Sequence, residues 1–174
     1  MIQDVRLAKN GDKEAFSRII KNTTDSLYKV AHGFFSDYNE IADVISNTIL
    51  KAYENIKSLK DEKYFKTWII KILINECNYI IRKNKKIVYL EDISQDIPSL
   101  ENNETIDIEQ CLNMLNQDLK NIVTLYYYEE FQVNEISQIL GIPEGTVKSR
   151  LSRARKYLYN ILKRREDCIW TKKK

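Results

Sequence analysis

The chain is poor in the residues that build tight turns, metal sites and disulfide frameworks. It has 4 Gly and 2 Pro in 174 residues, fewer than a β-rich fold normally needs. A single His32 and three scattered cysteines leave no ordinary zinc ligand spacing. The longest apolar run, Ile69 to Ile74, is interrupted by Lys71, and the first residues lack a signal-peptide pattern. These absences favour a helical protein of the cytoplasm and argue against export and membrane insertion.

Charge is abundant and unevenly distributed along the chain. Charged residues make up 30% of the sequence, and the formal net charge is only +3. Residues 1–86 carry +5, residues 87–130 carry −9, and residues 131–174 carry +7. Two basic ends therefore flank an acidic middle. Basic surfaces attract phosphate backbones, although a charged face can equally be a solvated surface with no partner.

The acidic middle contains the boundary between two predicted domains. Residues 87–107 contain six acids and Pro98 but no Lys or Arg. Their apolar residues do not recur with the period of a helix, 3.6, or of a strand, 2.0, and only residues 88–90 suggest a short ordered stretch. We therefore predict an all-α chain of two small helical domains joined by an acidic linker. The domains are residues 1–86 and residues 108–166, the linker is 87–107, and a basic tail covers 167–174.

Apolar spacing in the N-terminal domain predicts three helical stretches. Asp12 is a candidate helix N-cap before apolar residues that recur at intervals of three or four up to Phe34. A second stripe runs through Ile41, Val44, Thr48, Ala52 and Ile56. A third helix is predicted over residues 62–86, although its centre has strand-like propensity. The aromatic residues of this helix could stack on unpaired nucleic-acid bases beside its basic residues. Alternatively, the aromatic residues belong to the core and the basic residues form a solvated face.

The C-terminal domain has the pattern of a helix-turn-helix. Two helices divide near Asn116, and a short amphipathic helix over residues 133–140 ends at Gly141, with Pro143 at the first position of the last helix. Opposite the apolar stripe of that last helix lie Lys148, Ser149, Ser152, Arg153 and Lys156. A helix with such a face can enter the DNA major groove, so DNA binding is predicted. We interpret residues 128–130 as an edge facing solvent or protein, because their acids would repel phosphate.

The residues resemble the bacterial RNA polymerase sigma factors of the extracytoplasmic-function subfamily. Residues 135–155 are similar to the family's region four. Three further stretches resemble the family's opening, its polymerase-binding helix and its promoter-melting helix, in the family's order: Lys9-Asn10-Gly11-Asp12, Ala42-Asp43-Val44, and Phe65-Lys66-Thr67-Trp68 with Asn75. The resemblance covers almost the whole chain. It departs from the family at Ser46-Asn47, where Gln-Glu is frequent.

The resemblance implies a function and roles by position. The chain would bind core RNA polymerase, recognise a two-part promoter and assist its opening, without metal, cofactor, small-molecule substrate or catalytic residue. Asp43, Val44 and Asn47 would contact polymerase, and Trp68, Lys71 and Asn75 the opened minus-ten element. Lys148, Ser149, Ser152, Arg153 and Lys156 would contact the minus-thirty-five element. An anti-sigma factor, often membrane-bound, is the implied inhibitor.

Two other function classes compete with this interpretation. A free-standing helix-turn-helix regulator would bind a symmetric operator without polymerase, but the chain shows no coiled-coil heptad and no evident sensory pocket. An enzyme acting on nucleic acid would need clustered carboxylates, or a nucleophile beside a base. The single histidine, dispersed acids and lack of a phosphate-binding glycine loop disfavour that class.

Overall fold

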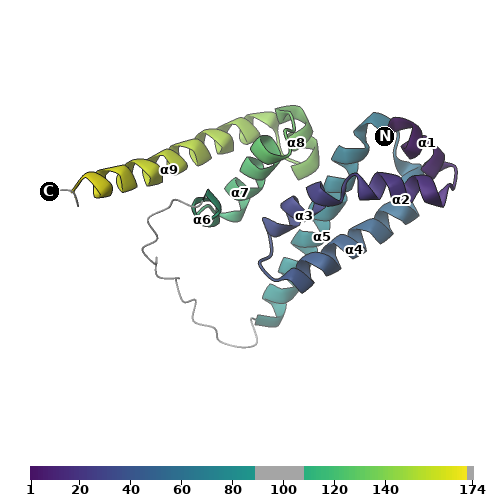
Figure 1. The fold of residues 1–174 in the computed structure, drawn as a ribbon, viewed down its shortest axis with the longest axis horizontal. Helices are drawn as coiled ribbons and strands as arrows, with labels where there is room; N and C mark the ends of the chain where they lie inside the picture. Colours follow the sequence, from purple (N-terminus) through teal and green to yellow (C-terminus); the bar gives the residue numbers. More distant parts are fainter. Residues whose placement is uncertain (89–107, 172–174) are drawn as a thin grey trace. The chain divides into compact units, whose positions relative to one another are not determined.

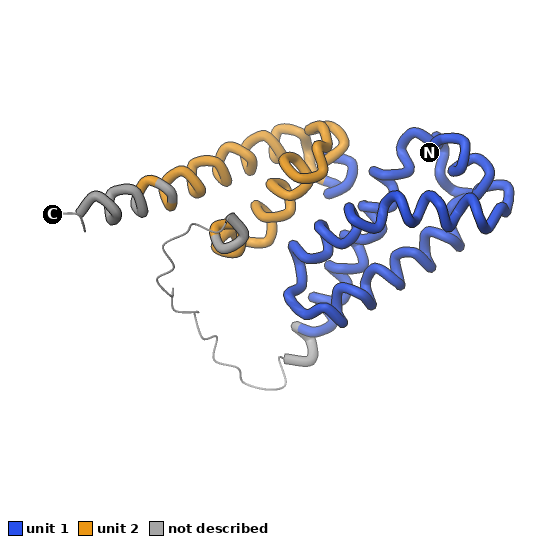
Figure 2. The backbone as a smooth tube through the Cα atoms, in the orientation of Figure 1, with its two compact units in different colours: residues 1–92, 137–141 blue, residues 93–136, 142–174 orange. Residues whose placement is uncertain are grey.

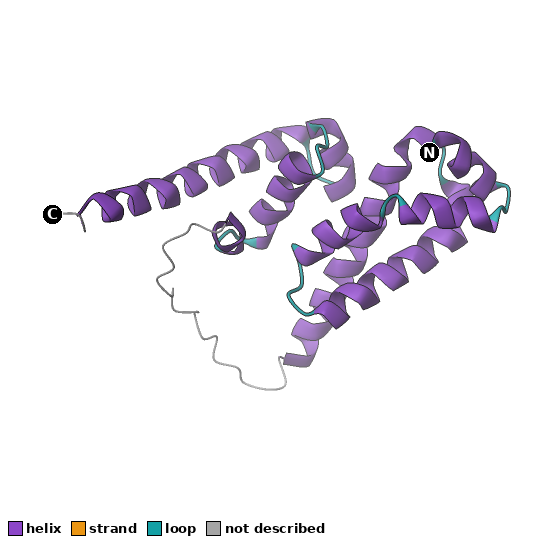
Figure 3. Cartoon of the chain, viewed as in Figure 1, coloured by secondary structure: helices purple, strands orange, loops and turns teal. Residues whose placement is uncertain are grey.

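The computed structural model describes the backbone of residues 1–88 and 108–171, with side chains except at 85–88, 108–110, 162 and 164–171. These residues form helices and no strand, which confirms the all-α prediction (Figures 1 and 3). Most of the predicted linker lies outside the described residues. Backbone contacts divide the chain into two units, residues 1–92 with 137–141, and residues 93–136 with 142–174 (Figure 2).

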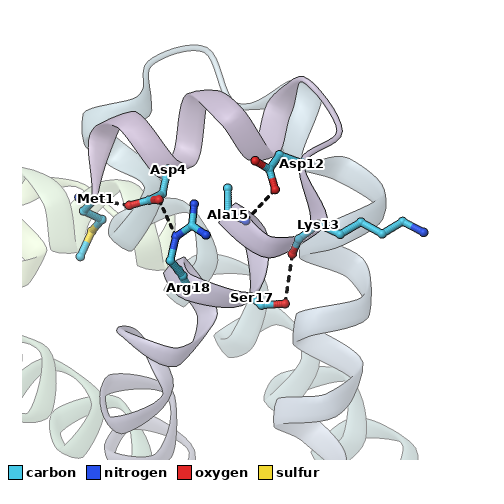
Figure 4. Close-up of polar contacts among 7 residues, drawn as sticks. All are labelled: Met1, Asp4, Asp12, Lys13, Ala15, Ser17 and Arg18. Atoms are coloured by element: carbon cyan, nitrogen blue, oxygen red, sulfur yellow. Dashed lines mark hydrogen bonds and ion pairs between the residues drawn. The ribbon is translucent and has the colours of Figure 1, made fainter.

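The first unit opens with three short helices: α1 (Ile2–Lys9), α2 (Lys13–Lys21) and α3 (Thr24–His32). Asp12 is the predicted N-cap of α2, because its carboxylate accepts the Ala15 N–H at 2.9 Å (Figure 4). Gly11, just before it, has φ +99°, a backbone conformation that glycine adopts without strain. Arg18 of α2 pairs with Asp4 of α1 at 2.9 Å.

Two longer helices complete the first unit, α4 (Tyr38–Asn55) and α5 (Phe65–Val88), with single turns η1 (Ile56–Ser58) and η2 (Glu62–Tyr64) between them. The Asp37 carboxylate caps α4 by accepting the N–H of Asn39. The stripe predicted on α4 is buried, and α5 presents its own buried side to it: Phe65, Ile69, Ile70, Leu73 and Cys77. The helix predicted over residues 62–86 is thus confirmed from Phe65 onward, whereas residues 62–64 form the separate turn η2.

The second unit contains α6 (Ile108–Asn113), α7 (Gln117–Val123), the π-helical turn η3 (Thr124–Tyr128) and α9 (Glu144–Thr171). The predicted break near Asn116 is confirmed, because its side chain caps α7 by accepting the Leu119 N–H at 3.0 Å. α7 and α9 pack through a small apolar core of Leu112, Leu115, Val123 and Ala154, with Leu119 and Leu158 against it.

The predicted helix-turn-helix elements are present as α8 (Val133–Leu140) and α9. Gly141 has φ +65° in the turn between them. α9 begins at Glu144, one residue later than predicted, so Pro143 lies just outside the helix. The Pro143 carbonyl accepts the Val147 N–H at 3.1 Å. α9 continues to Thr171, so the first residues of the predicted basic tail are helical.

Two sequence interpretations need correction at the edges of these elements. α5 extends to Val88, so residues 87 and 88 are helical rather than part of the linker. Glu129, which we expected to face solvent or a partner, is only 5% exposed. None of the described helices combines the length and apolar character that crossing a membrane requires.

Candidate nucleic-acid interface

The outward face of α9 is the first part of the candidate site. Val147, Leu151 and Ala154 are buried on one side of the helix. All five residues predicted to contact DNA are exposed: Lys148, Ser149, Ser152, Arg153 and Lys156. The amphipathic pattern therefore predicted correctly which side of α9 is exposed, and that side carries three cations and two hydroxyls. These groups can contact phosphates and base edges.

Two arginines at the edges of this face contact the rest of the second unit. Arg150 Nη2 lies 2.8 Å from Asp118 Oδ2 of α7. Arg155 Nε donates to the Tyr127 hydroxyl at 2.7 Å, and its guanidinium lies 5.8 Å from the centre of the Tyr126 ring. Donating this hydrogen bond to Tyr127 raises the pKa of Arg155. Neither partner follows from sequence spacing, because both lie on other elements of the second unit.

Arg153 differs from these two neighbours. Within the described part of the chain it has no ion pair, hydrogen bond or ring contact, and its side chain is exposed. Truncating it would therefore leave no polar group unsatisfied. Of the three arginines in this part of α9, Arg153 is the one whose guanidinium is available to another molecule.

A pocket of about 290 Å³ in the first unit is the second part of the candidate site. It brings together two predicted minus-ten residues, Trp68 and Asn75, which line it from α5. The third, Lys71, is exposed on α5 but does not line the pocket. The remaining lining residues come from α4, the turn after it and α5: Lys51, Asn55, Ser58, Ile72 and Glu76.

The pocket is lined by both apolar and polar side chains. Trp68 is partly exposed, with its ring 6.0 Å from that of Phe65, which is buried in the core. Lys51 Nζ donates to Glu76 Oε1 at 2.6 Å across the gap between α4 and α5. An aromatic surface beside hydrogen-bonding groups is an arrangement that can hold a planar base. The sequence did not identify the Lys51–Glu76 pair.

The residues predicted to contact polymerase do not share one face of α4. Asp43 and Asn47 are exposed one turn apart, whereas Val44 is 0% exposed. The Val44 side chain is part of the core and cannot contact a partner, so its assignment is corrected. Leu50, 56% exposed one turn beyond Asn47, extends the exposed face. Leu50 was not among the predicted residues, although its position off the buried stripe of α4 was a usable signal.

The described residues contain no group of three or more His, Cys, Asp or Glu side chains that could hold a metal ion. Cys77 and Cys111 are buried free thiols, and burial raises the pKa of Cys77 to about 12. Neither cysteine belongs to the α9 face, the pocket or the exposed face of α4.

Comparisons with known proteins match both parts of the chain. The family model of Sigma-70 region 2 matches residues 19–87, and that of Sigma-70 region 4 matches residues 105–158. The chain is 29% identical to the ECF RNA polymerase sigma factor SigW of Bacillus subtilis, covering 91% of this chain and 95% of the relative. It is 27% identical to the ECF RNA polymerase sigma-E factor of Haemophilus influenzae, covering 90% and 92%.

Two solved structures have a similar fold. The sigma factor RpoE of Bartonella quintana, solved with the anti-sigma factor NepR, matches with a TM-score of 0.72 and 26% identity over 85% of this chain and 96% of that one. CnrH, solved with the cytosolic domain of CnrY, matches with a TM-score of 0.71 and 18% identity over 93% and 96%.

Proposed function

The chain belongs to the sigma-70 family as a sigma factor of the extracytoplasmic-function type, and we propose that its two units divide the recognition of a two-part promoter. Its function is promoter-specific transcription initiation with RNA polymerase. The observation that carries the proposed division is that one chain holds a pocket suited to an unpaired base and, after it in sequence, a basic helix suited to duplex DNA. In this proposal residues 1–86 and residues 108–166 are the working domains.

The outward face of α9 is proposed to bind the minus-thirty-five element. Lys148, Arg153 and Lys156 supply positive charge, and Ser149 and Ser152 supply hydroxyls that can donate or accept. The Ser149 hydroxyl donates to the Thr146 carbonyl at 3.0 Å within the helix, which leaves its oxygen lone pairs to accept. Phosphate contacts would position the helix, and Arg153 would read a base edge.

The pocket and its rim are proposed to bind the opened minus-ten element. Trp68 offers a partly exposed aromatic surface for stacking, which contributes about 1–3 kcal/mol per base. Asn75 has an amide that can both donate and accept, so it can hydrogen-bond the edge of a base that has left the duplex. Lys71, exposed on the same helix, would neutralise a backbone phosphate.

The exposed face of α4 is proposed to dock on core RNA polymerase. Asp43 and Asn47 supply polar contacts, and Leu50 supplies apolar area beside them. A face with an apolar centre and polar neighbours is typical of protein–protein contacts. We infer that the polymerisation chemistry belongs to the polymerase, and that this chain supplies no catalytic residue.

The chain is proposed to act in the cytoplasm, where its polymerase and promoters are, and to be controlled by an anti-sigma factor. RpoE and CnrH, whose folds it shares, were solved in complexes with NepR and CnrY. Such a partner could hold the chain at a membrane if the partner itself were anchored there.

A binding and transcription assay tests the proposal. The purified chain is mixed with core RNA polymerase, recovered by pull-down, and used for run-off transcription from genomic fragments. Stable association and discrete transcripts that depend on the chain are the expected result. Absence of association, together with tight binding of the chain alone to a palindromic duplex, would overturn the proposal in favour of a free-standing regulator.

A further inference from the structure

Part of the polar lining of the pocket is an ion pair between two helices. Lys51 on α4 and Glu76 on α5 meet at 2.6 Å, and their side chains are 50% and 12% exposed. The Glu76 carboxylate is thus mostly shielded from water, yet it lines the pocket. Lys51 contacts one carboxylate oxygen, Oε1, which leaves the second oxygen, Oε2, as a further acceptor.

An ionised carboxylate can only accept hydrogen bonds. The second oxygen of Glu76, Oε2, has no protein partner among the described residues. It would accept from an exocyclic amino group, as carboxylates do from cytosine N4. The O4 carbonyl of thymine, placed at the same point, would bring two acceptors together, with no hydrogen between them to share.

We propose that the Lys51–Glu76 pair makes this pocket select an unpaired base that carries an exocyclic amino group and reject thymine. The inference rests on the proposed function, since it assumes that the pocket receives a base of the opened promoter strand. Trp68 and Ile72 would hold the base plane without regard to its identity, while Glu76 makes the distinction. Asn75, which can donate and accept, accommodates whatever group lies beside the amino group.

A purely structural role for the ion pair makes a different prediction. As a tether between α4 and α5, the pair would affect stability without affecting which base is preferred. Glu76→Gln separates the two roles, because the glutamine amide keeps the shape and can donate to a thymine carbonyl. Lys51→Arg keeps a cation beside Glu76 and serves as the conservative variant. Glu14→Gln, an exposed site on α2, is the matched control for loss of one negative charge.

The test uses the full chain bound to core RNA polymerase. The probe is a DNA library with a randomised segment upstream of a fixed transcribed region, and the transcribed templates are sequenced. Wild-type holoenzyme should deplete thymine at one position of the opened element by about five- to tenfold relative to amino-bearing bases, as expected for one well-placed hydrogen-bonding side chain. Glu76→Gln should abolish that depletion at the same position, whereas Lys51→Arg and Glu14→Gln should retain it.

The outcomes separate this inference from the function on which it rests. Transcription by the wild-type holoenzyme with no thymine depletion, or with a depletion that Glu76→Gln leaves unchanged, would overturn the inference alone. Failure of the wild-type chain to bind polymerase or to direct any transcript would overturn the proposed function and, with it, the inference. Loss of thymine depletion in Glu14→Gln as well would show that overall charge, not the pocket, sets the preference.

Discussion

Replacing Arg153 by alanine is the sharpest test of the α9 surface. Arg153 is exposed and has no partner among the described residues, so its truncation removes no contact within the fold. Alanine also has a helix propensity at least as high as that of arginine. The variant should therefore keep its unfolding free energy within about 0.5 kcal/mol of wild type. Any loss of DNA affinity then reports on the complex and not on folding.

The size of the affinity loss follows from what Arg153 contacts. A bidentate contact to a guanine edge is worth about 1–3 kcal/mol, which corresponds to roughly a 5- to 150-fold increase in Kd. Such a variant would also relax sequence preference at one base pair. A contact to phosphate would weaken all sequences similarly and reduce the slope of log K against log salt by about 0.9. Fluorescence anisotropy of the full chain with a selected promoter duplex, at several salt concentrations, measures both quantities.

Arg150→Ala is the matched control, because Arg150 lies on the same helix three residues earlier. Its guanidinium pairs with Asp118, whose side chain is 63% exposed, and such surface pairs contribute about 0.2–1 kcal/mol. We expect a small loss of stability and little change in DNA affinity. If Arg153→Ala left the Kd and the salt slope unchanged, or if both variants weakened binding equally, the assigned α9 face would be wrong.

Three further predictions concern the first unit. Asp43→Ala should weaken co-purification with core polymerase while leaving binding to the minus-thirty-five duplex intact; loss of both would indicate unfolding. Asp12→Ala removes the acceptor of the Ala15 N–H and should lower the free energy of unfolding in urea by about 0.5–2 kcal/mol; no change would show that the cap is dispensable. Cys77, whose pKa burial raises to about 12 from 9.0, should resist iodoacetamide at pH 8 when folded but not in denaturant. Because the thiol ionises at lower pH in the unfolded chain, the stability contributed by the buried, protonated Cys77 should fall between pH 9 and about 12. Rapid alkylation of the folded chain would contradict the burial of Cys77.

Much of the fold follows from local periodicity. The stripe on α4 and the division of α9 into buried and exposed sides depend on residues three and four apart on one helix, which sequence spacing displays directly. The end of α2 was harder to predict. Apolar intervals continue from α2 into α3, and neither Gly nor Pro separates them. The break falls near Thr23, whose hydroxyl donates to the Ile19 carbonyl at 2.6 Å.

The candidate site was only partly predictable for a related reason. Val44 was assigned to the polymerase surface by its place in a family motif, although its position in the apolar stripe already pointed inward. The Lys51–Glu76 pair joins residues 25 positions apart, and their meeting depends on how α4 and α5 pack. The spacing of residues along one helix does not give the register in which α4 and α5 pack against each other. Motif position therefore located the right helices, while packing decided which of their residues reach the surface.

In the proposed function the two surfaces need different states of the DNA, which sets an order of events. The α9 face would bind an intact major groove, whereas the pocket would receive only a base that has left the stack. A single recognition module buries only about 600–1,000 Å² on DNA, which favours weak binding until polymerase adds its own contacts. Duplex recognition through Arg153 should thus govern initial promoter affinity, and base choice at Glu76 should govern the opening step. A defect at Arg153 would then be overcome by higher holoenzyme concentration, whereas a mismatched base at Glu76 would slow opening even at saturation.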